Sequence, residues 1–206
     1  MKPRDNPFRA ARISSLPYRF PRELSWTALF NRLQRLHYRG ALVGPEGSGK
    51  TTLLEEMDRR LTNAGFTTRL LSARSGLAHQ TLGPASCRGV FLLIDSAERL
   101  NWFQWRLLRW HARRAAGLVV TLHVTARMPT LYDCRTTPEL FRELVHELLP
   151  AGYQAFPGCG DLVPLFHKHR GNIRSALREL YDIFSTVPLL KPEAGQPVQL
   201  LAIVGN

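Results

Sequence analysis

Residues 40–57 read GALVGPEGSGKTTLLEEM, and this stretch decides the fold. The fixed positions of the pattern G-x-x-x-x-G-K-[ST] are occupied by Gly44, Gly49, Lys50 and Thr51. The apolar residues before Gly44 predict a short strand, and the residues after Gly49 predict an amphipathic helix. Glycines at such a junction let backbone N–H groups and the positive end of the helix point at an anion. The stretch therefore predicts a phosphate-binding loop.

Two side chains of this loop are expected to make further contacts with ATP. Lys50 would set a full positive charge against the β- and γ-phosphates, and the Thr51 hydroxyl would be a ligand of Mg²⁺. The alternative is a glycine-rich turn that matches the pattern by chance. The residues expected to bind the nucleotide are Gly44, Pro45, Glu46, Gly47, Ser48, Gly49, Lys50, Thr51 and Thr52.

A second motif, GVFLLIDSAERL at residues 89–100, predicts the rest of a magnesium site. Its apolar run, residues 90–94, predicts a buried strand that ends at Asp95, and ligands of parallel sheets bind at this end of the strands. We expect Asp95 to hold Mg²⁺ opposite Thr51. Taken alone, an Asp in this position is also a common strand-ending or helix-capping residue.

Hydrolysis of ATP also needs a group that orients or deprotonates the attacking water. Glu98 lies three residues past Asp95 and is the candidate, whereas Ser96 directly follows the Asp. The alternative role of Glu98 is to stabilise the N-terminus of a helix through the helix dipole. The sequence leaves both roles open, and with them the choice between turnover and binding alone.

Outward from these motifs, short apolar runs alternate with longer amphipathic stretches, which is typical of a parallel sheet covered by helices. The pattern predicts an α/β fold of the P-loop kind, with three α/β/α layers, a mostly parallel sheet and a small C-terminal helical lid. Strands are expected at residues 41–43, 66–71, 90–94 and 118–124, and a fifth near 153–156. Helices are expected at residues 25–37, 49–64, 97–116, 138–149, 161–169 and 172–184.

Composition shifts divide the chain into four expected parts. Residues 1–39 form a basic extension with a packing helix capped by Ser25, and residues 40–157 form the nucleotide-binding core. Residues 158–186 form the helical lid, and residues 187–206 form a tail that the sequence does not assign to any layer. The irregular residues 75–88 fit no expected helix or strand.

Charge and composition limit the classes of molecule that the chain is expected to bind. The 206 residues include 28 Lys and Arg against 16 Asp and Glu, a net charge of +12 that attracts phosphates, nucleic acid or acidic proteins. A solvated basic face without a partner is the alternative. No apolar run approaches the ~18 residues of a membrane span, and the N-terminus lacks the apolar segment of a secretory signal. We expect a cytoplasmic protein with no membrane partner and three free cysteines.

The expected helix at residues 97–116 interleaves aromatic residues with arginines. The favoured interpretation is that its tryptophans pack on the sheet while its arginines are solvated on the opposite face. The alternative is that the rings stack on nucleic-acid bases while the arginines bind phosphates. The residues concerned are Trp102, Phe103, Trp105 and Trp110 with Arg99, Arg106, Arg109, Arg113 and Arg114.

With these motifs, residues 40–184 resemble the AAA+ branch of P-loop ATPases, in particular its origin-recognition and transposition-helper types. The resemblance rests on a Walker A loop GPEGSGKT, a Walker B strand LLID, the strand LVVTLHVT and the motif HRGNIRSALRELYD. The resemblance implies that Arg174 is the sensor 2 arginine that contacts the γ-phosphate. It also implies a polar sensor at the end of the fourth strand, for which Thr121 and His123 are the candidates.

Proteins of this family act as rings in which an arginine of a neighbouring subunit completes the site, so the resemblance implies a homo-oligomer. Arg127 and Arg135 are the candidates for that arginine. The function expected is a Mg²⁺-dependent ATPase or nucleotide switch acting on DNA or a protein partner, with Lys50, Asp95, Glu98 and Arg174 in the catalytic site. One alternative is a small-molecule kinase whose acceptor binds at residues 75–88. The other is a nucleotide-binding adaptor that does not hydrolyse ATP.

Overall fold

The computed structural model describes residues 6–20, 24–75, 87–125, 127–149 and 162–186. These residues belong to two compact units, each described here by itself. Pro17–Arg135 form a sheet unit, and Met1–Leu16 with Thr136–Asn206 form a helical unit. The strand expected near residues 153–156, the tail at 187–206, Cys159 and most of the expected acceptor region lie outside the described residues.

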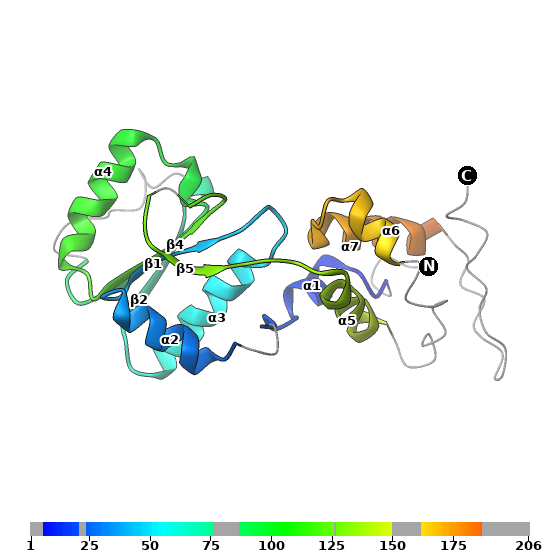
Figure 1. Cartoon of the computed structure of the whole chain (residues 1–206), viewed down its shortest axis with the longest axis horizontal. Helices are drawn as coiled ribbons and strands as arrows, with labels where there is room; N and C mark the ends of the chain where they lie inside the picture. Colours follow the sequence, from blue (N-terminus) through cyan, green and yellow to red (C-terminus); the bar gives the residue numbers. More distant parts are fainter. Residues whose placement is uncertain (1–5, 21–23, 76–86, 126, 150–161, 187–206) are drawn as a thin grey trace. The chain divides into compact units, whose positions relative to one another are not determined.

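The sheet unit contains a parallel sheet of five strands in the order β2-β3-β4-β1-β5. The strands are β1 (Arg39–Val43), β2 (Thr68–Ser72), β3 (Phe91–Asp95), β4 (Gly117–Leu122) and β5 (Thr130–Asp133). In register, Val43 of β1 lies opposite Leu122 of β4, and Ile94 of β3 lies opposite Val120. The carboxyl ends of β1, β3 and β4 therefore meet at one edge of the sheet, and the α/β class expected from the sequence is confirmed (Figure 1).

Helices cover both faces of this sheet (Figure 1). On one face α2 (Trp26–Arg35) and α3 (Lys50–Asn63) bury leucines against Leu42, Leu93 and Val119. On the other face α4 (Trp102–His111) packs against the alternate residues of the same strands, such as Ile94 and Val120. Strands buried on both faces read as continuous apolar runs, which is why the sequence revealed β3 and β4.

The N-terminus of α2 confirms a capping prediction. The Ser25 hydroxyl accepts a hydrogen bond from the Ala28 backbone N–H, and Leu29 and Leu33 are buried. A serine at this position satisfies one of the backbone N–H groups that lack a partner in the first helical turn.

The fifth strand and the helix near α4 differ from the sequence prediction. β5 lies directly after Pro129 and was missed, because its four residues include a single fully buried side chain, Leu131.

The single helix expected at residues 97–116 is wrong in extent. A 3-10 turn at Ala97–Arg99 comes first, and α4 then begins behind a capping box formed by Asn101 and Gln104. The capping box starts a new helix because it satisfies the first backbone N–H groups locally.

The favoured interpretation of this region holds for Trp105 and for the arginines, which are exposed, but it is wrong for the other three aromatic residues. Trp105 is 8% exposed and packs on the sheet, but Trp102 is 73%, Phe103 65% and Trp110 54% exposed. The buried face of α4 is already filled by Trp105, Leu108 and the following Ala112, so the sheet has no room for the other rings.

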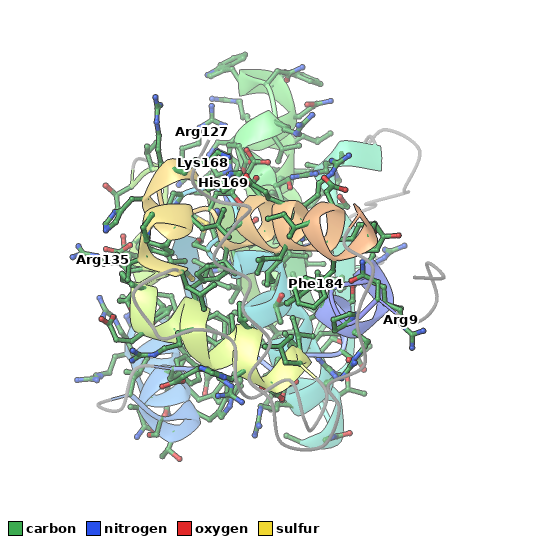
Figure 2. All side chains as sticks on the ribbon, turned by 90° about the vertical axis from the view of Figure 1, so that its right-hand side faces the viewer. Arg9, Arg127, Arg135, Lys168, His169 and Phe184 are labelled. Carbon is green, nitrogen blue, oxygen red and sulfur yellow. The ribbon has the colours of Figure 1, made fainter. Side chains whose placement is uncertain are left out.

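The helical unit consists of α1 (Ala10–Ser14), α5 (Pro138–Leu148), α6 (Leu162–Lys168) and α7 (Ile173–Thr186). Thr137 caps α5 through its hydroxyl, and Pro138 occupies the first turn as expected. Glu179 accepts a hydrogen bond from Lys168 Nζ at 2.7 Å and pairs with His169 Nε2 at 2.7 Å; both basic side chains are labelled in Figure 2.

The N-terminal segment belongs to this helical unit. Phe8 is buried in the helical core and meets the ring of Phe184 edge to face, with ring centroids 5.0 Å apart. The Asn6 side-chain amide donates to the Tyr181 carbonyl oxygen at 2.9 Å. This division differs from the one expected from composition, which grouped residues 1–39 together and placed the helix after Pro138 in the core. None of the described helices is both long and apolar enough to cross a bilayer.

Candidate functional site

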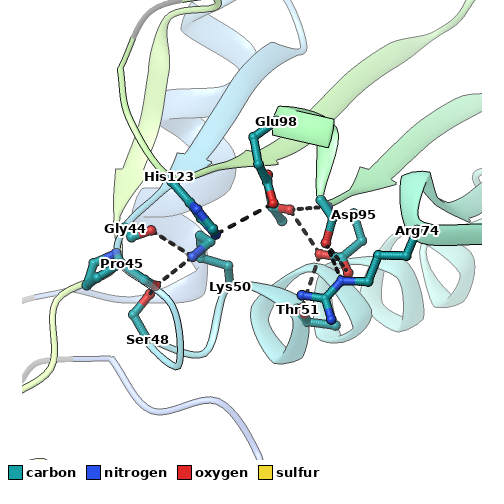
Figure 3. A network of polar contacts seen from close by, with 11 residues as sticks. Gly44, Pro45, Ser48, Lys50, Thr51, Arg74, Asp95, Glu98 and His123 are labelled. Atoms are coloured by element: carbon teal, nitrogen blue, oxygen red, sulfur yellow. Dashed lines mark hydrogen bonds and ion pairs between the residues drawn. The ribbon is translucent and has the colours of Figure 1, made fainter. Parts of the chain in front are cut away.

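The loop at residues 44–51 connects β1 to α3 and depends on its glycines. A Cβ at Gly44 would collide with the Cys134 carbonyl oxygen and lie 2.8 Å from Ser48 Oγ. Gly47 and Gly49 have φ of 75° and 83°, in the left-handed region that glycine adopts without penalty. The loop is therefore as tight as the sequence pattern requires, and Figure 3 shows it beside the ends of the strands.

Lys50 is folded back over this loop. Its Nζ donates to the carbonyl oxygens of Gly44 at 2.7 Å and Pro45 at 2.6 Å, and the residue is 8% exposed. Burial lowers the pKa of the Lys50 ammonium, and the negative charges of Glu98 and Asp95 oppose that shift. The backbone of the loop thus holds a cation at the N-terminus of α3.

The other loop residues expected to bind the nucleotide have distinct positions. Ser48 is buried, and its hydroxyl donates to the Pro45 carbonyl oxygen at 2.8 Å. Pro45 and Glu46 are exposed at the tip of the loop, whereas Thr52 is half-buried in the first turn of α3.

Asp95 connects three elements through its two carboxylate oxygens. Oδ1 accepts hydrogen bonds from Thr51 Oγ1 at 3.1 Å and from Thr121 Oγ1 at 2.9 Å. Oδ2 accepts a hydrogen bond from Ser96 Oγ at 3.3 Å. The structure therefore brings the predicted metal ligands Thr51 and Asp95 together, with Thr121 of β4 beside them (Figure 3).

Ser96 occupies a strained and fully packed position. It is buried with φ of 59°, a left-handed conformation that costs a residue with a side chain about 1–3 kcal/mol. Its backbone N–H donates to Thr121 Oγ1 at 2.6 Å, which fixes the hydroxyl that contacts Asp95. The surrounding hydrogen bonds hold Ser96 in this conformation.

Arg74 is a neighbour of this site that sequence reasoning missed. Its Nε donates to Ser96 Oγ at 3.1 Å (Figure 3). Arg74 lies in the 3-10 turn Ala73–Ser75 just past β2, and β2 pairs with β3 so that Ser72 lies opposite Asp95. The sequence offered one signal, a basic residue just after a predicted strand, but the strand order that places it here is a property of the whole sheet.

Glu98 and His123 lie on the same side of the site. His123 Nε2 is 3.5 Å from Glu98 Oε1. The other oxygen, Glu98 Oε2, is buried and has no hydrogen-bond partner among the described residues. Of the two candidates at the end of β4, Thr121 contacts Asp95 and His123 contacts Glu98.

A half-buried tyrosine beside the loop was also not predicted. A Cβ on Gly49 would approach Tyr18 Cε2 at 3.1 Å, so the Tyr18 ring lies close against the loop. Burial raises the pKa of the Tyr18 hydroxyl, and burial likewise raises the pKa of the nearby Cys134 thiol to about 12. Cys87 and Cys134 are both free and buried.

The arginines expected at the γ-phosphate are held as follows. Arg127 Nη1 donates to the Leu100 carbonyl oxygen at 3.0 Å, and its guanidinium lies 5.2 Å from the centre of the Trp105 ring. Arg135 Nε donates to Asp133 Oδ2 at 2.8 Å and is exposed. Arg174 is exposed in the first turn of α7 and belongs to the helical unit, so its role stays a prediction.

The residues fit a magnesium ion in type and placement. Mg²⁺ in nucleotide sites is bound by one or two protein oxygens together with phosphates and water, and Thr51 and Asp95 offer such oxygens side by side. Among the described residues, no three His, Cys, Asp or Glu side chains gather into a metal site.

Comparison of the sequence with protein-family models and with curated proteins found no match to either.

Proposed function

We propose that this chain binds Mg·ATP and acts as an AAA+-type ATPase or nucleotide switch on nucleic acid or a protein partner. One observation carries the proposal. At one edge of a parallel sheet, the buried ammonium of Lys50, the Thr51 hydroxyl and the Asp95 carboxylate border a glycine loop at a helix N-terminus.

Phosphate binding follows from the charge and the backbone of this loop. The N-terminus of α3 carries a positive partial charge, and its first N–H groups have no partner within the helix. Lys50 adds a full charge, and its present hydrogen bonds to two carbonyl oxygens are ones that phosphate oxygens can replace. A polyphosphate is the anion whose length and charge suit a loop of this size.

Thr51 and Asp95 would hold Mg²⁺, which neutralises negative charge on the phosphates when it is bound. The hydrogen bonds from Thr121 and Ser96 keep the Asp95 carboxylate oriented toward Thr51. These two residues therefore position the metal ligand.

Glu98 is the candidate for orienting the attacking water. Its buried Oε2 lacks a hydrogen-bond partner among the described residues, and a buried acceptor without a partner is costly unless something binds there. A water molecule placed by this oxygen would have its proton accepted by a carboxylate next to the metal ligands. His123 Nε2 lies 3.5 Å from the other oxygen, Oε1, so the two oxygens of Glu98 have different surroundings.

The adaptor without turnover is the second candidate function, and Ser96 favours it. The residue directly after Asp95 is a serine whose hydroxyl donates to that carboxylate, so this position supplies no general base. Phosphate binding and hydrolysis therefore have separate tests.

Phosphate release from Mg·ATP tests the proposal, measured alone, with DNA and with candidate small acceptors. Glu98→Gln keeps the size of the side chain but removes its charge, so we expect release to fall about 10²-fold or more while ATP binding persists. Glu55→Gln, at an exposed position of α3, is the matched control and should change nothing. ATP binding without release would support the adaptor, and transfer of phosphate to an acceptor would support the kinase.

A further inference from the structure

The outer side of α4 exposes three aromatic side chains. Trp102 and Phe103 open the helix, and Trp110 lies eight residues after Trp102, about 12 Å farther along the helix axis. Leu107 is exposed between them. Large rings are rarely left in water without a role, so this face, called the α4 face below, needs an explanation.

The charge around these rings has one sign. The sequence contains no acidic residue between Glu98 and Asp133. The exposed arginines on α4 and the turns at its two ends are Arg99, Arg106, Arg109, Arg113 and Arg114. Within the described parts of the chain, none of these five forms an ion pair, and the guanidinium of Arg106 lies 5.8 Å from the centre of the Trp102 ring.

We propose that the α4 face binds single-stranded nucleic acid, with bases stacked on Trp102, Phe103 and Trp110 and phosphates bound by the arginines. Stacking on aromatic side chains together with a positive surface is the chemistry by which proteins bind single strands without sequence preference. Arginine suits this role because its planar guanidinium both pairs with phosphate and stacks on rings. The inference rests on the proposed function in one respect, since it names the partner on which the nucleotide switch acts.

Two features favour a single strand over other acidic partners. A strand supplies a phosphate with every nucleotide, whereas an acidic protein segment would need a carboxylate placed at each guanidinium. A duplex also supplies phosphates, but its bases are already stacked on one another and leave the three exposed rings without partners. Rings and arginines are interleaved along α4, so a strand on this face would have both bases and phosphates within reach of suitable side chains.

The test uses the full chain and a short fluorescein-labelled oligothymidylate, with binding followed by fluorescence anisotropy. Trp102→Ala, Phe103→Ala and Trp110→Ala combined should weaken binding at least about tenfold, because the bases no longer have rings on which to stack. Trp102→Phe with Trp110→Phe retains rings and should keep most of the affinity. Binding of a duplex of the same length should change little in the triple variant.

The arginines are tested by the salt dependence of binding between about 50 and 200 mM salt. Arg109→Ala with Arg113→Ala should reduce the slope of log affinity against log salt by about 0.7 for each phosphate that the variant no longer neutralises. Arg35→Ala with Arg59→Ala removes the same charge from exposed positions on α2 and α3 and is the matched control. The control should leave the slope unchanged.

Three results would overturn the inference. The first is that the oligonucleotide does not bind at low salt, and the second is that the triple variant binds it with the same affinity as the wild-type chain. The third is that the chain binds polyglutamate but not the oligonucleotide. The last result would assign the α4 face to a protein partner. Mg·ATP retention is measured on the same samples, so a chain that binds the strand but not ATP would refute the proposed function and leave this inference standing.

Discussion

At the scale of single residues, Asp95 is the group on which the candidate site converges. Its two oxygens accept hydrogen bonds from Thr51, Thr121 and Ser96, so hydroxyl groups from three elements surround one carboxylate. Hydroxyl donors leave the carboxylate with lone pairs to spare, and no lysine or arginine pairs with it among the described residues. A carboxylate kept in this state is ready to bind a cation.

Asp95→Asn tests this role. The amide keeps the shape and one acceptor oxygen but loses the charge, so we expect the Mg²⁺ concentration needed for ATP binding to rise at least about tenfold. ATP affinity measured over a Mg²⁺ series would show this shift. Asp133→Asn, an exposed position at the end of β5, should leave the series unchanged, and an equal effect of both substitutions would count against the assignment.

Lys50 and Thr51 could be predicted because fixed spacing along the chain defines them, and Asp95 because it directly follows an apolar run. Arg74 and Tyr18 could not, since each reaches the site through strand order or through a segment that crosses the loop. The choice between Thr121 and His123 also needed the structure, because both lie near the end of β4 and only the register shows which contacts Asp95.

At the scale of elements, α4 shows where sequence patterns reach their limit. The buried strands were evident from apolar runs, and Ser25 was recognised as a cap from its position before such a run. On α4 there are more aromatic side chains than the sheet can bury, and the sequence pattern does not show which of them are exposed. A helix buries only the stripe that faces its neighbour, here Trp105, Leu108 and Ala112.

His111, the last residue of α4, predicts a dependence of stability on pH. It is buried, its Nδ1 lacks a partner among the described residues, and burial lowers its pKa below the ordinary value of about 6.5. Below that pH the unfolded chain binds a proton that the folded chain does not, so the free energy of unfolding falls as pH falls. Above that pH, His111 is neutral in both the folded and the unfolded chain, and its contribution to the free energy of unfolding no longer changes with pH.

Denaturant unfolding at several pH values between about 5 and 8 measures this, with His111→Phe for comparison. Tryptophan fluorescence is a suitable signal because all four tryptophans lie in the sheet unit. The variant should lose part of the pH dependence. His146→Gln, at an exposed position of α5, should keep it, and an unchanged pH profile in His111→Phe would refute the assignment.

At the scale of the whole molecule, the two units are built from pieces distant in sequence. Residues 6–16 precede the sheet unit yet pack with the helices that follow it, so the chain enters and leaves the sheet unit through the helical one. Composition cannot reveal such a return, because the N-terminal residues read as a basic extension. The contacts of Asn6 and Phe8 with Tyr181 and Phe184 join residues more than 170 positions apart, and they become evident only in the folded chain.

Phe8→Ala tests this arrangement. Removing a buried ring from a core costs about 3–5 kcal/mol, and the loss should fall on the helical unit alone. Hydrogen exchange should therefore show reduced protection in α5 and α7 with unchanged protection in β3 and β4. Phe103→Ala, whose ring is exposed, serves as the control, and weakened protection of the central strands in Phe8→Ala would contradict the division into units.

The most direct measurement is calorimetric titration of the full chain with Mg·ATP, before and after Lys50→Ala. The buried ammonium of Lys50 is the one full positive charge that the loop itself holds at the N-terminus of α3. We predict saturable binding by the wild-type chain and a decrease of at least about tenfold in affinity for the variant. Wild-type protein that does not bind Mg·ATP, or equal binding by the variant, would contradict the central claim.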